Sequence, residues 1–201
     1  VSRRLATIKH FGRTLAERVH GYINPAREAK APVVQPTKPD AVAAGDIELL
    51  RQAAAQLVTD SSDSFLPLRN QFLLELLLST GLRADEVRLL VVSQISEDRN
   101  WLRNVKTKGK KFRNVYLDTN VRPMLENYLQ QREQVLLERY PDYRELTQQA
   151  QQKFPVFISL YRASVQTPQT FGLAPKTIWR IISTFGVKAQ QLSDSPVGNL
   201  H

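Results

Sequence analysis

The sequence predicts an α+β fold that is mostly helical and carries one small antiparallel hairpin. Apolar residues recur at helical spacing along most of the 201 residues. Residues 101–117 differ, because they read as two short strands that meet at Lys108-Gly109, a dipeptide suited to a tight turn. A chain of this length can hold one large hydrophobic core or two small domains.

The charge balance predicts a polyanionic partner. The formal net charge is +9 and the isoelectric point is near 10.0, which favours nucleic acid over an anionic membrane. No apolar run reaches the roughly 18 residues of a membrane span, and no signal peptide opens the chain. The lack of cysteine excludes thiolate zinc sites, disulfides and thiol chemistry, and the three histidines show no metal-ligand spacing. We therefore expect a cytoplasmic protein with no metal and no cofactor.

The first thirty residues predict a basic helix. Apolar residues recur near helical spacing over residues 3–20, and residues 1–30 hold seven lysines or arginines against two acids. A solvated helix face and a DNA-facing helix both explain this bias. Three prolines then lie among small and polar residues, so residues 31–45 are expected to form an interdomain linker.

The remaining residues, 46–201, predict further helices around the hairpin. Helical spacing of apolar residues indicates helices at about 46–58, 66–78, 84–90, 121–136 and 175–189. The 66–78 helix is apolar almost all round, so it is expected to be buried. Gly81 supplies a left-handed residue to end it, and Pro175 suits the first position of the last helix. Residues 148–153 are polar and are expected to form a loop.

The segment 78–87 carries the first candidate for chemistry. Its sequence, Leu-Ser-Thr-Gly-Leu-Arg-Ala-Asp-Glu-Val, ends an apolar helix at Gly81 and sets Arg83 at the start of the next helix. A guanidinium offers a planar fork of donors that matches two phosphate oxygens at any working pH. Glu86 follows one helical turn later and can orient that fork. The alternative is a helix C-cap followed by a surface salt bridge.

The predicted hairpin carries the second candidate. From Arg99 to Arg113 there are seven lysines or arginines and no acid. Such a run is usually a solvated face or a non-specific phosphate contact. Lys108 differs because it stands beside a glycine at the tip, where its ammonium can swing in and donate a proton. Three neighbours would supply the positive charge that acidifies this proton and favours general-acid chemistry: Lys106, Lys110 and Lys111.

Together these segments resemble the tyrosine recombinase (phage integrase) family over nearly the whole chain. The family's first arginine box is similar to Thr-Gly-Leu-Arg at 80–83, with Glu86. Its hairpin motif, Gly-Lys-Gly-x-Lys-x-Arg before a Val-x-Leu strand, is similar to residues 107–117. Residues 176–189 resemble the segment before the family's second box. Residues 1–30, which end near Asn24-Pro25-Ala26, resemble the last helix of its core-binding domain.

The resemblance implies a reaction and roles for individual residues. In the family, a tyrosine attacks a DNA phosphate and leaves a 3′-phosphotyrosine and a free 5′-hydroxyl, without metal or ATP. Carried over by position, Arg83 stabilises the transition state, Glu86 is its acidic companion and Lys108 protonates the leaving oxygen. His201 is the histidine of the His-x-x-Arg box, the residue before it, or an ordinary histidine. The nucleophilic tyrosine is implied downstream of His201, so none of the tyrosines at 116–161 is expected to act.

The resemblance also implies how the protein meets DNA. The expected DNA contacts are basic residues of the first helix, the hairpin and the last helix: Arg3, Arg4, Lys9, Arg13, Lys106, Lys110, Lys111, Arg113, Lys176 and Arg180. Residues 1–30 are expected to be the C-terminal helix of a core-binding, DNA-clamping domain, 31–45 a linker, and 46–201 the N-terminal part of a catalytic domain with the DNA breaking-rejoining fold.

The expected assembly and source follow from the same resemblance. The parent is expected to be a site-specific recombinase, bacterial or phage-encoded and nucleoid-associated, that forms a homotetramer on double-stranded DNA. The chain itself is expected to be an inactive, monomeric fragment. Two other interpretations stay open: a non-catalytic DNA-binding protein that kept the fold, and an unrelated basic helical module that binds RNA or DNA.

Overall fold

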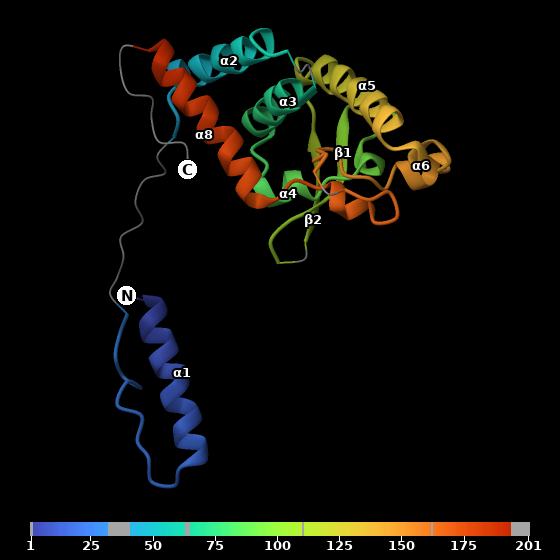
Figure 1. The fold of residues 1–201 in the computed structure, drawn as a ribbon. Coiled ribbons are helices and arrows are strands. Elements are labelled where there is room, and N and C mark those ends of the chain that lie inside the picture. The colour runs from blue at the N-terminus through green and yellow to red at the C-terminus, as the bar shows by residue number, and fades with distance from the viewer. Residues whose placement is uncertain (1, 32–40, 63–64, 110, 162, 194–201) are drawn as a thin grey trace. The chain divides into compact units, whose positions relative to one another are not determined.

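The chain divides into two compact units, Val1–Ala41 and Val42–His201. The computed structural model describes residues 2–31, 41–62, 65–109, 111–161 and 163–193 (Figure 1). Within these ranges no helix is both long and apolar enough to cross a membrane.

The first unit is built on one helix, α1 (Ser2–Arg18). The chain then returns along it, and the Asn24 side chain fixes that return by donating from Nδ2 to the Lys9 carbonyl oxygen at 3.1 Å. A Cβ on Gly12 would lie 2.3 Å from Oδ1 of Asn24, so only glycine permits this close approach. Several apolar side chains of the unit stay exposed: Ile8, Phe11, Val19 and Ile23.

The second unit packs four long helices together. Helix α2 (Ala44–Thr59) contacts both α3 (Phe65–Thr80) and α8 (Pro175–Leu192). Helix α3 also contacts α5 (Val121–Arg139). Figure 1 shows α8, in red, running alongside α2 and reaching α4 at its other end. The buried face of each helix therefore meets a neighbouring helix, as the apolar spacing of the sequence predicts.

Stacked aromatic rings form the centre of this unit. Phe72 of α3 stacks on Tyr128 of α5 and on Phe157, with ring centroids 5.2 and 5.4 Å apart. Such offset stacks add to the free energy of burial. The Tyr128 hydroxyl donates to the Val156 carbonyl oxygen at 2.9 Å, so its polar end is satisfied. The predicted buried character of the 66–78 helix is confirmed.

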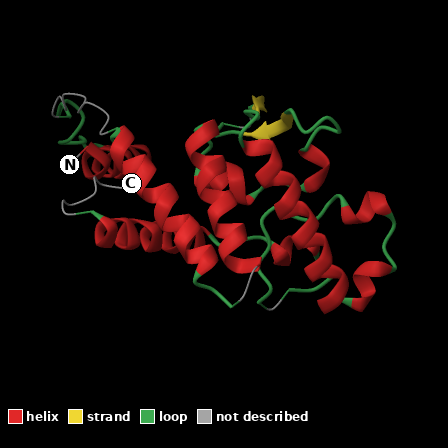
Figure 2. Cartoon of the chain, turned by 90° about the horizontal axis from the view of Figure 1, so that it is seen from above, coloured by secondary structure: helices red, strands yellow, loops and turns green. Residues whose placement is uncertain are grey.

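The two strands, yellow in Figure 2, lie at one edge of the helical unit. Strands β1 (Trp101–Lys106) and β2 (Phe112–Tyr116) pair antiparallel, with Val105 opposite Arg113. Gly109 has φ 85° and makes the turn between them, so the predicted hairpin is confirmed. A hairpin of this kind turns most easily at a residue without a Cβ.

A bulge in β1 changes the course of the hairpin. The register shifts between Leu102 and Val105, and Asn104 adopts φ 54°. The Gln94 side-chain amide donates to the carbonyl oxygens of Arg103 and Asn104 at 3.2 and 2.8 Å, which holds the bulge in place. Bulges of this kind bend a strand and redirect what lies beyond them, here the tip that carries the predicted general acid.

Short helical elements complete the second unit: α4 (Ala84–Arg88), η1 (Val92–Gln94), α6 (Pro141–Arg144), α7 (Gln148–Gln151) and η2 (Pro168–Phe171). The prediction of a loop over residues 148–153 was wrong for residues 148–151, which form α7. Thr147 caps α7 by accepting the Ala150 N–H on its hydroxyl oxygen at 3.3 Å. This capping signal stands in the sequence, but the polar composition concealed the helix.

Candidate functional site

Arg83 lies at the junction between α3 and α4. Gly81 has φ 60°, the left-handed conformation that ends α3 as predicted. Arg83 is then the N-cap residue of α4, with φ −75° and ψ 152°. Its backbone N–H donates to Oε2 of Glu86 at 3.0 Å, as in one half of a capping box. The helix C-cap and the ion pair of the alternative interpretation are both present, at Gly81 and between Arg83 and Glu86, but Glu86 is buried, so the pair is not a surface salt bridge.

The carboxylate of Glu86 is shared between two arginines from different elements. Oε1 accepts Nη1 of Arg83 at 3.1 Å, and Oε2 accepts Nη2 of Arg113 on β2 at 3.0 Å. The Glu86 side chain is 3% exposed, whereas those of Arg83 and Arg113 are 70% and 43% exposed. A buried carboxylate thus holds two guanidinium groups that reach the surface.

The hydrogen bonds of Glu86 keep it ionised. Burial would raise the pKa of Glu86, but the backbone and side-chain hydrogen bonds from Arg83, together with the charge of Arg113, outweigh it and lower the pKa. The site therefore holds two guanidinium charges against one carboxylate charge, a net charge of one positive unit. Such a site attracts an anion to its exposed side.

Arg83 keeps most of its donors available. Within the described ranges only Nη1 of Arg83 is hydrogen-bonded, whereas Nε and Nη2 have no bonding partner among those residues. These two nitrogens form an edge of the guanidinium plane, which is the geometry that binds two phosphate oxygens at once. Glu86 fixes the opposite edge, so the arrangement can present Arg83 to a phosphate without further ordering of the side chain.

The hairpin tip exposes its lysines. Lys106, Lys108 and Lys111 are exposed, and the Thr107 N–H donates to the Lys111 carbonyl oxygen at 2.8 Å across the tip. Lys110 and His201 lie outside the described residues. Among the described residues, no group of three or more histidines and carboxylates is placed to hold a metal ion.

The other predicted DNA contacts lie on two helices. On α1, Arg3, Arg4 and Arg13 are exposed and Lys9 is half-buried. Lys9 and Arg13 line a hollow in the first unit together with Arg27, which the sequence analysis did not single out although it belongs to the same basic run. On α8, Lys176 and Arg180 are exposed beside Trp179, whose side chain is 66% exposed.

The pairing of Arg113 with Glu86 is the feature that sequence reasoning missed. A signal for it exists in β2, because residues two apart on a strand share a face. Val115 is buried, so Arg113 lies on the same inward face as an apolar residue. A lone cation on the buried face of a strand predicts a buried anionic partner.

Burial disfavours two of the tyrosines as nucleophiles. Tyr128 and Tyr143 are 0% and 1% exposed, and burial raises the pKa of each to about 12. The Tyr143 hydroxyl donates to Glu133 at 2.9 Å. Neither phenol can reach a DNA phosphate from these positions.

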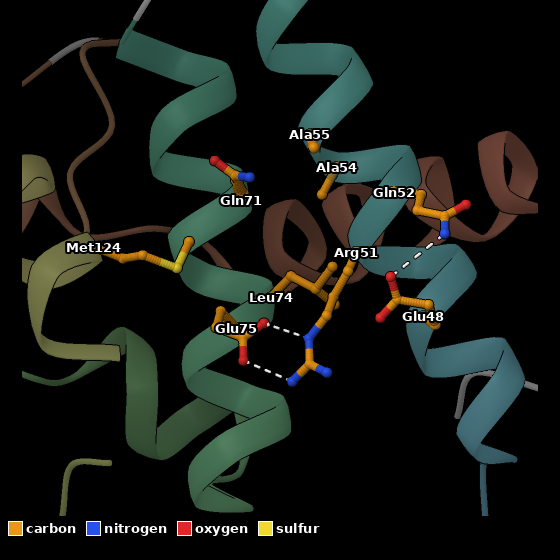
Figure 3. Close-up of a pocket in the computed structure, with 9 residues that line it drawn as sticks. All are labelled: Glu48, Arg51, Gln52, Ala54, Ala55, Gln71, Leu74, Glu75 and Met124. Atoms are coloured by element: carbon orange, nitrogen blue, oxygen red, sulfur yellow. Dashed lines mark hydrogen bonds and ion pairs between the residues drawn. The ribbon is translucent and has the colours of Figure 1, made fainter. Parts of the chain in front are cut away.

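The charged groups that line a hollow between α2, α3 and α5 bind one another (Figure 3). Nε and Nη2 of Arg51 donate to the two carboxylate oxygens of Glu75 at 2.9 and 2.8 Å. The side-chain amide of Gln52 donates to Glu48 at 3.4 Å. The guanidinium of this hollow is therefore already paired along the edge that Arg83 leaves exposed.

Comparison with known proteins gives one family and one fold. The family model described as "Phage integrase family" matches residues 48–191, well over half of the chain. A solved structure described as "Crystal structure of XerA recombinase" matches with a TM-score of 0.50 and 20% sequence identity, over 98% of this chain and 57% of that chain. This chain thus spans little more than half the length of that structure. No curated protein matches this chain.

Proposed function

Because the chain belongs to the phage integrase family, we propose that the full-length protein is a site-specific recombinase. It would cut and rejoin DNA through a 3′-phosphotyrosine intermediate. The predicted family resemblance and the predicted mostly helical α+β fold are both confirmed. The observation that carries the proposal is Arg83, held by Glu86 along one edge and exposed along the other.

The proposed chemistry assigns separate tasks to Arg83 and Lys108. A tyrosine oxygen attacks phosphorus, a pentavalent transition state forms, and the bond between phosphorus and the 5′-oxygen breaks. Arg83 binds two non-bridging oxygens and stabilises the charge that develops on them. Lys108 gives its proton to the departing 5′-oxygen. The phosphotyrosine ester conserves the free energy of the broken bond, so rejoining by a 5′-hydroxyl needs no ATP, metal or cofactor.

The proposed organisation follows the family. Residues 1–30 would contain the last helix of a core-binding domain, which is α1; residues 31–45 would be a linker, and 46–201 part of the catalytic domain. The basic residues predicted to contact DNA on α1, at the tip of the hairpin and on α8 would bind the backbone of double-stranded DNA. The nucleophilic tyrosine would follow His201, and the full-length protein would act as a homotetramer on DNA.

Covalent trapping tests this function and does not require the target site to be identified first. The full-length protein is incubated with a pool of nicked duplexes of randomised sequence, because a nick lets the short fragment with the new 5′-hydroxyl diffuse away and prevents rejoining. We expect a protein–DNA adduct that survives denaturing detergent and yields phosphotyrosine on digestion. Binding to the pool without any adduct would instead identify a non-catalytic DNA-binding protein that kept the fold.

The parent gene offers an independent check. Translated past His201, it should encode a His-x-x-Arg box followed some tens of residues later by a tyrosine, and replacement of that tyrosine by phenylalanine should abolish the adduct. A reading frame that contains neither the box nor the tyrosine would contradict the proposed enzyme.

A further inference from the structure

The ion pair between Glu86 and Arg113 joins the two parts of the proposed site. Glu86 belongs to α4, whose N-cap residue is Arg83, whereas Arg113 belongs to the hairpin that carries Lys108. Arg113 lies opposite Val105, one register position before the Lys106–Phe112 pair that closes onto the tip. Among the described residues it is the tie between hairpin and helices that lies nearest to the tip.

The charge balance of the site depends on Arg113. With Arg113 present, the carboxylate of Glu86 is divided between two guanidinium groups, at 3.1 Å from Arg83 and 3.0 Å from Arg113. Without it, Arg83 and Glu86 would form a pair with no net charge. Such a pair has little attraction for the negative charge that a phosphoryl transition state develops. An arginine bound to a carboxylate that has no other partner would also turn more of its donors toward that carboxylate.

Burial separates Glu86 from an ordinary surface partner. Its side chain is 3% exposed, so water cannot replace the hydrogen bond that Arg113 gives. The side chain of Arg113 is 43% exposed, and its Nη2 is directed to Glu86. Its position is therefore set by the protein, in contrast to the exposed lysines of the tip.

We propose that Arg113 is a positioning residue of the recombinase, acting through Glu86 on Arg83, and not primarily a DNA contact. It takes up part of the carboxylate charge, so that Arg83 faces the phosphate with its own charge largely uncompensated. It also ties the hairpin to α4 close to the tip, so that the positions of Lys108 and Arg83 are fixed relative to each other. This inference rests on the proposed function.

Cleavage and binding by Arg113→Gln separate positioning from DNA contact. The substitution keeps a side-chain N–H donor but removes the charge. In the full-length protein we expect the cleavage rate at saturating nicked DNA to fall by roughly 10–100-fold, as when the groups that orient a functional side chain are lost at metal sites. The salt dependence of DNA binding should stay unchanged. Arg113→Lys keeps the charge and should restore most of the rate.

Arg103→Gln is the matched control. Arg103 is an exposed arginine of β1 in the same hairpin, and its removal changes the net charge by the same amount without touching Glu86. We expect cleavage at saturating DNA to stay within about threefold of the parent, because an exposed substitution away from the site has a small effect. Equal rate losses for Arg103→Gln and Arg113→Gln would overturn the positioning role and indicate a general effect of charge.

A double-mutant cycle with Glu86→Gln tests whether Arg113 affects the cleavage rate through Glu86. If Arg113 acts by balancing the charge of Glu86, its removal should matter little once that charge is gone, so the two losses should not multiply. Full multiplication of the two losses would overturn the proposal. So would an Arg113→Gln variant with parental cleavage at saturating DNA and a salt slope shallower by about 0.9, the value for one phosphate contact.

The outcome for the parent protein distinguishes this inference from the proposed function. A parent that cleaves while Arg113→Gln cleaves equally well removes the positioning role and leaves the recombinase proposal intact. A parent that binds DNA but forms no adduct removes the recombinase proposal and, with it, the role of Arg113.

Discussion

Arg83 and Arg132 share one functional group but have opposite surroundings. Arg83, at the start of α4, keeps 70% of its side chain exposed and gives Nη1 to Glu86. Arg132, on α5, is 2% exposed. Its Nε and Nη2 both donate to the Pro155 carbonyl oxygen, at 3.1 and 2.9 Å, and its Nη1 lies 3.7 Å from Glu133.

The difference in burial decides whether a guanidinium can still bind a ligand in the folded protein. Arg132 uses its paired donors for hydrogen bonds to the protein's own backbone. These bonds attach α5 to the buried segment after Pro155, so Arg132 stabilises the fold. Arg83 is fixed along one edge, which orders the side chain while leaving the other edge free for a ligand. Burial and partners therefore separate a structural arginine from a candidate catalytic one, where residue type does not.

Lys108, which is exposed like Arg83, should give the largest loss of cleavage rate when it is replaced. A 5′-alkoxide is a poor leaving group, and general-acid assistance is worth roughly 10²–10⁴-fold in rate. Lys108→Ala in the full-length protein should slow cleavage by about that factor. A substrate with sulfur at the bridging 5′ position leaves as a thiolate and needs no proton, so it should restore most of the parental rate to Lys108→Ala.

The same sulfur substrate locates the acid if the hairpin register is wrong. It should not rescue an Arg83 variant, because the lost role there is charge stabilisation on non-bridging oxygens. Rescue of Lys106→Ala or Lys110→Ala in place of Lys108→Ala would move the acid to that position. Rescue of none of them would leave the hairpin with the role of holding the DNA backbone.

Glu86 is a buried group within the exposed site, so its replacement should change stability as well as cleavage. Glu86→Gln should lower the free energy of unfolding by about 1–3 kcal/mol at neutral pH, since it weakens the buried hydrogen bonds of two arginines. The pKa of Glu86 is lowered in the folded protein, so its contribution is present above the unfolded pKa of about 4.3 and is lost as the pH falls through the lower folded pKa.

Denaturant titrations of parent and Glu86→Gln between pH 7 and pH 3 measure this difference. The gap in unfolding free energy should be widest at pH 7 and should narrow toward pH 3. Glu126→Gln, an exposed change on α5, is the control and should show almost no gap at any pH. A gap for Glu86→Gln that grows as the pH falls would show that the carboxylate is not stabilised in its ionised form.

The basic helix α1 should give the smallest effect of a single substitution. The chain is expected to bind duplex DNA weakly and with steep salt dependence, because its cations release condensed counterions. Arg13→Gln should make the slope of log affinity against log salt shallower by about 0.9. Arg139→Gln, an exposed change at the end of α5, should leave the slope unchanged. An affinity that does not change between low and moderate salt would contradict the DNA-binding assignment of α1.

Most of the fold could be predicted from local sequence rules for glycine, proline and apolar spacing. Gly81 and Gly109 sit where the backbone needs positive φ, and Pro175 sits at the first position of α8, so turns and helix starts could be placed from single residues. The buried helix α3 could be placed because it is apolar almost all round. Helix α7 was missed because its capping threonine precedes a run of glutamines that carries no apolar spacing.

The candidate site could be predicted only in part, because its decisive contact is not local. Arg83 and Glu86 lie three residues apart, and their pairing follows from helix geometry. Glu86 and Arg113 lie 27 residues apart, and only the packing of the hairpin on α4 brings them together. Arg132 is followed directly by Glu133, and Arg83 is followed by Glu86 three residues later. Both arginines thus have a glutamate close by in the sequence, and only the fold shows that one guanidinium is buried and the other exposed.

Paired lysine substitutions at Arg83 and Arg132 in the full-length protein test this account most directly. Both keep the charge and remove the fork. We predict that Arg83→Lys lowers the cleavage rate by roughly 10²–10³-fold and changes the unfolding free energy by at most about 0.5 kcal/mol. Arg132→Lys should instead lose about 1–3 kcal/mol of stability and cleave at the parental rate per folded molecule. Parental cleavage by Arg83→Lys, with the loss of stability at that position, would show that Arg83 is a structural cap and contradict the account.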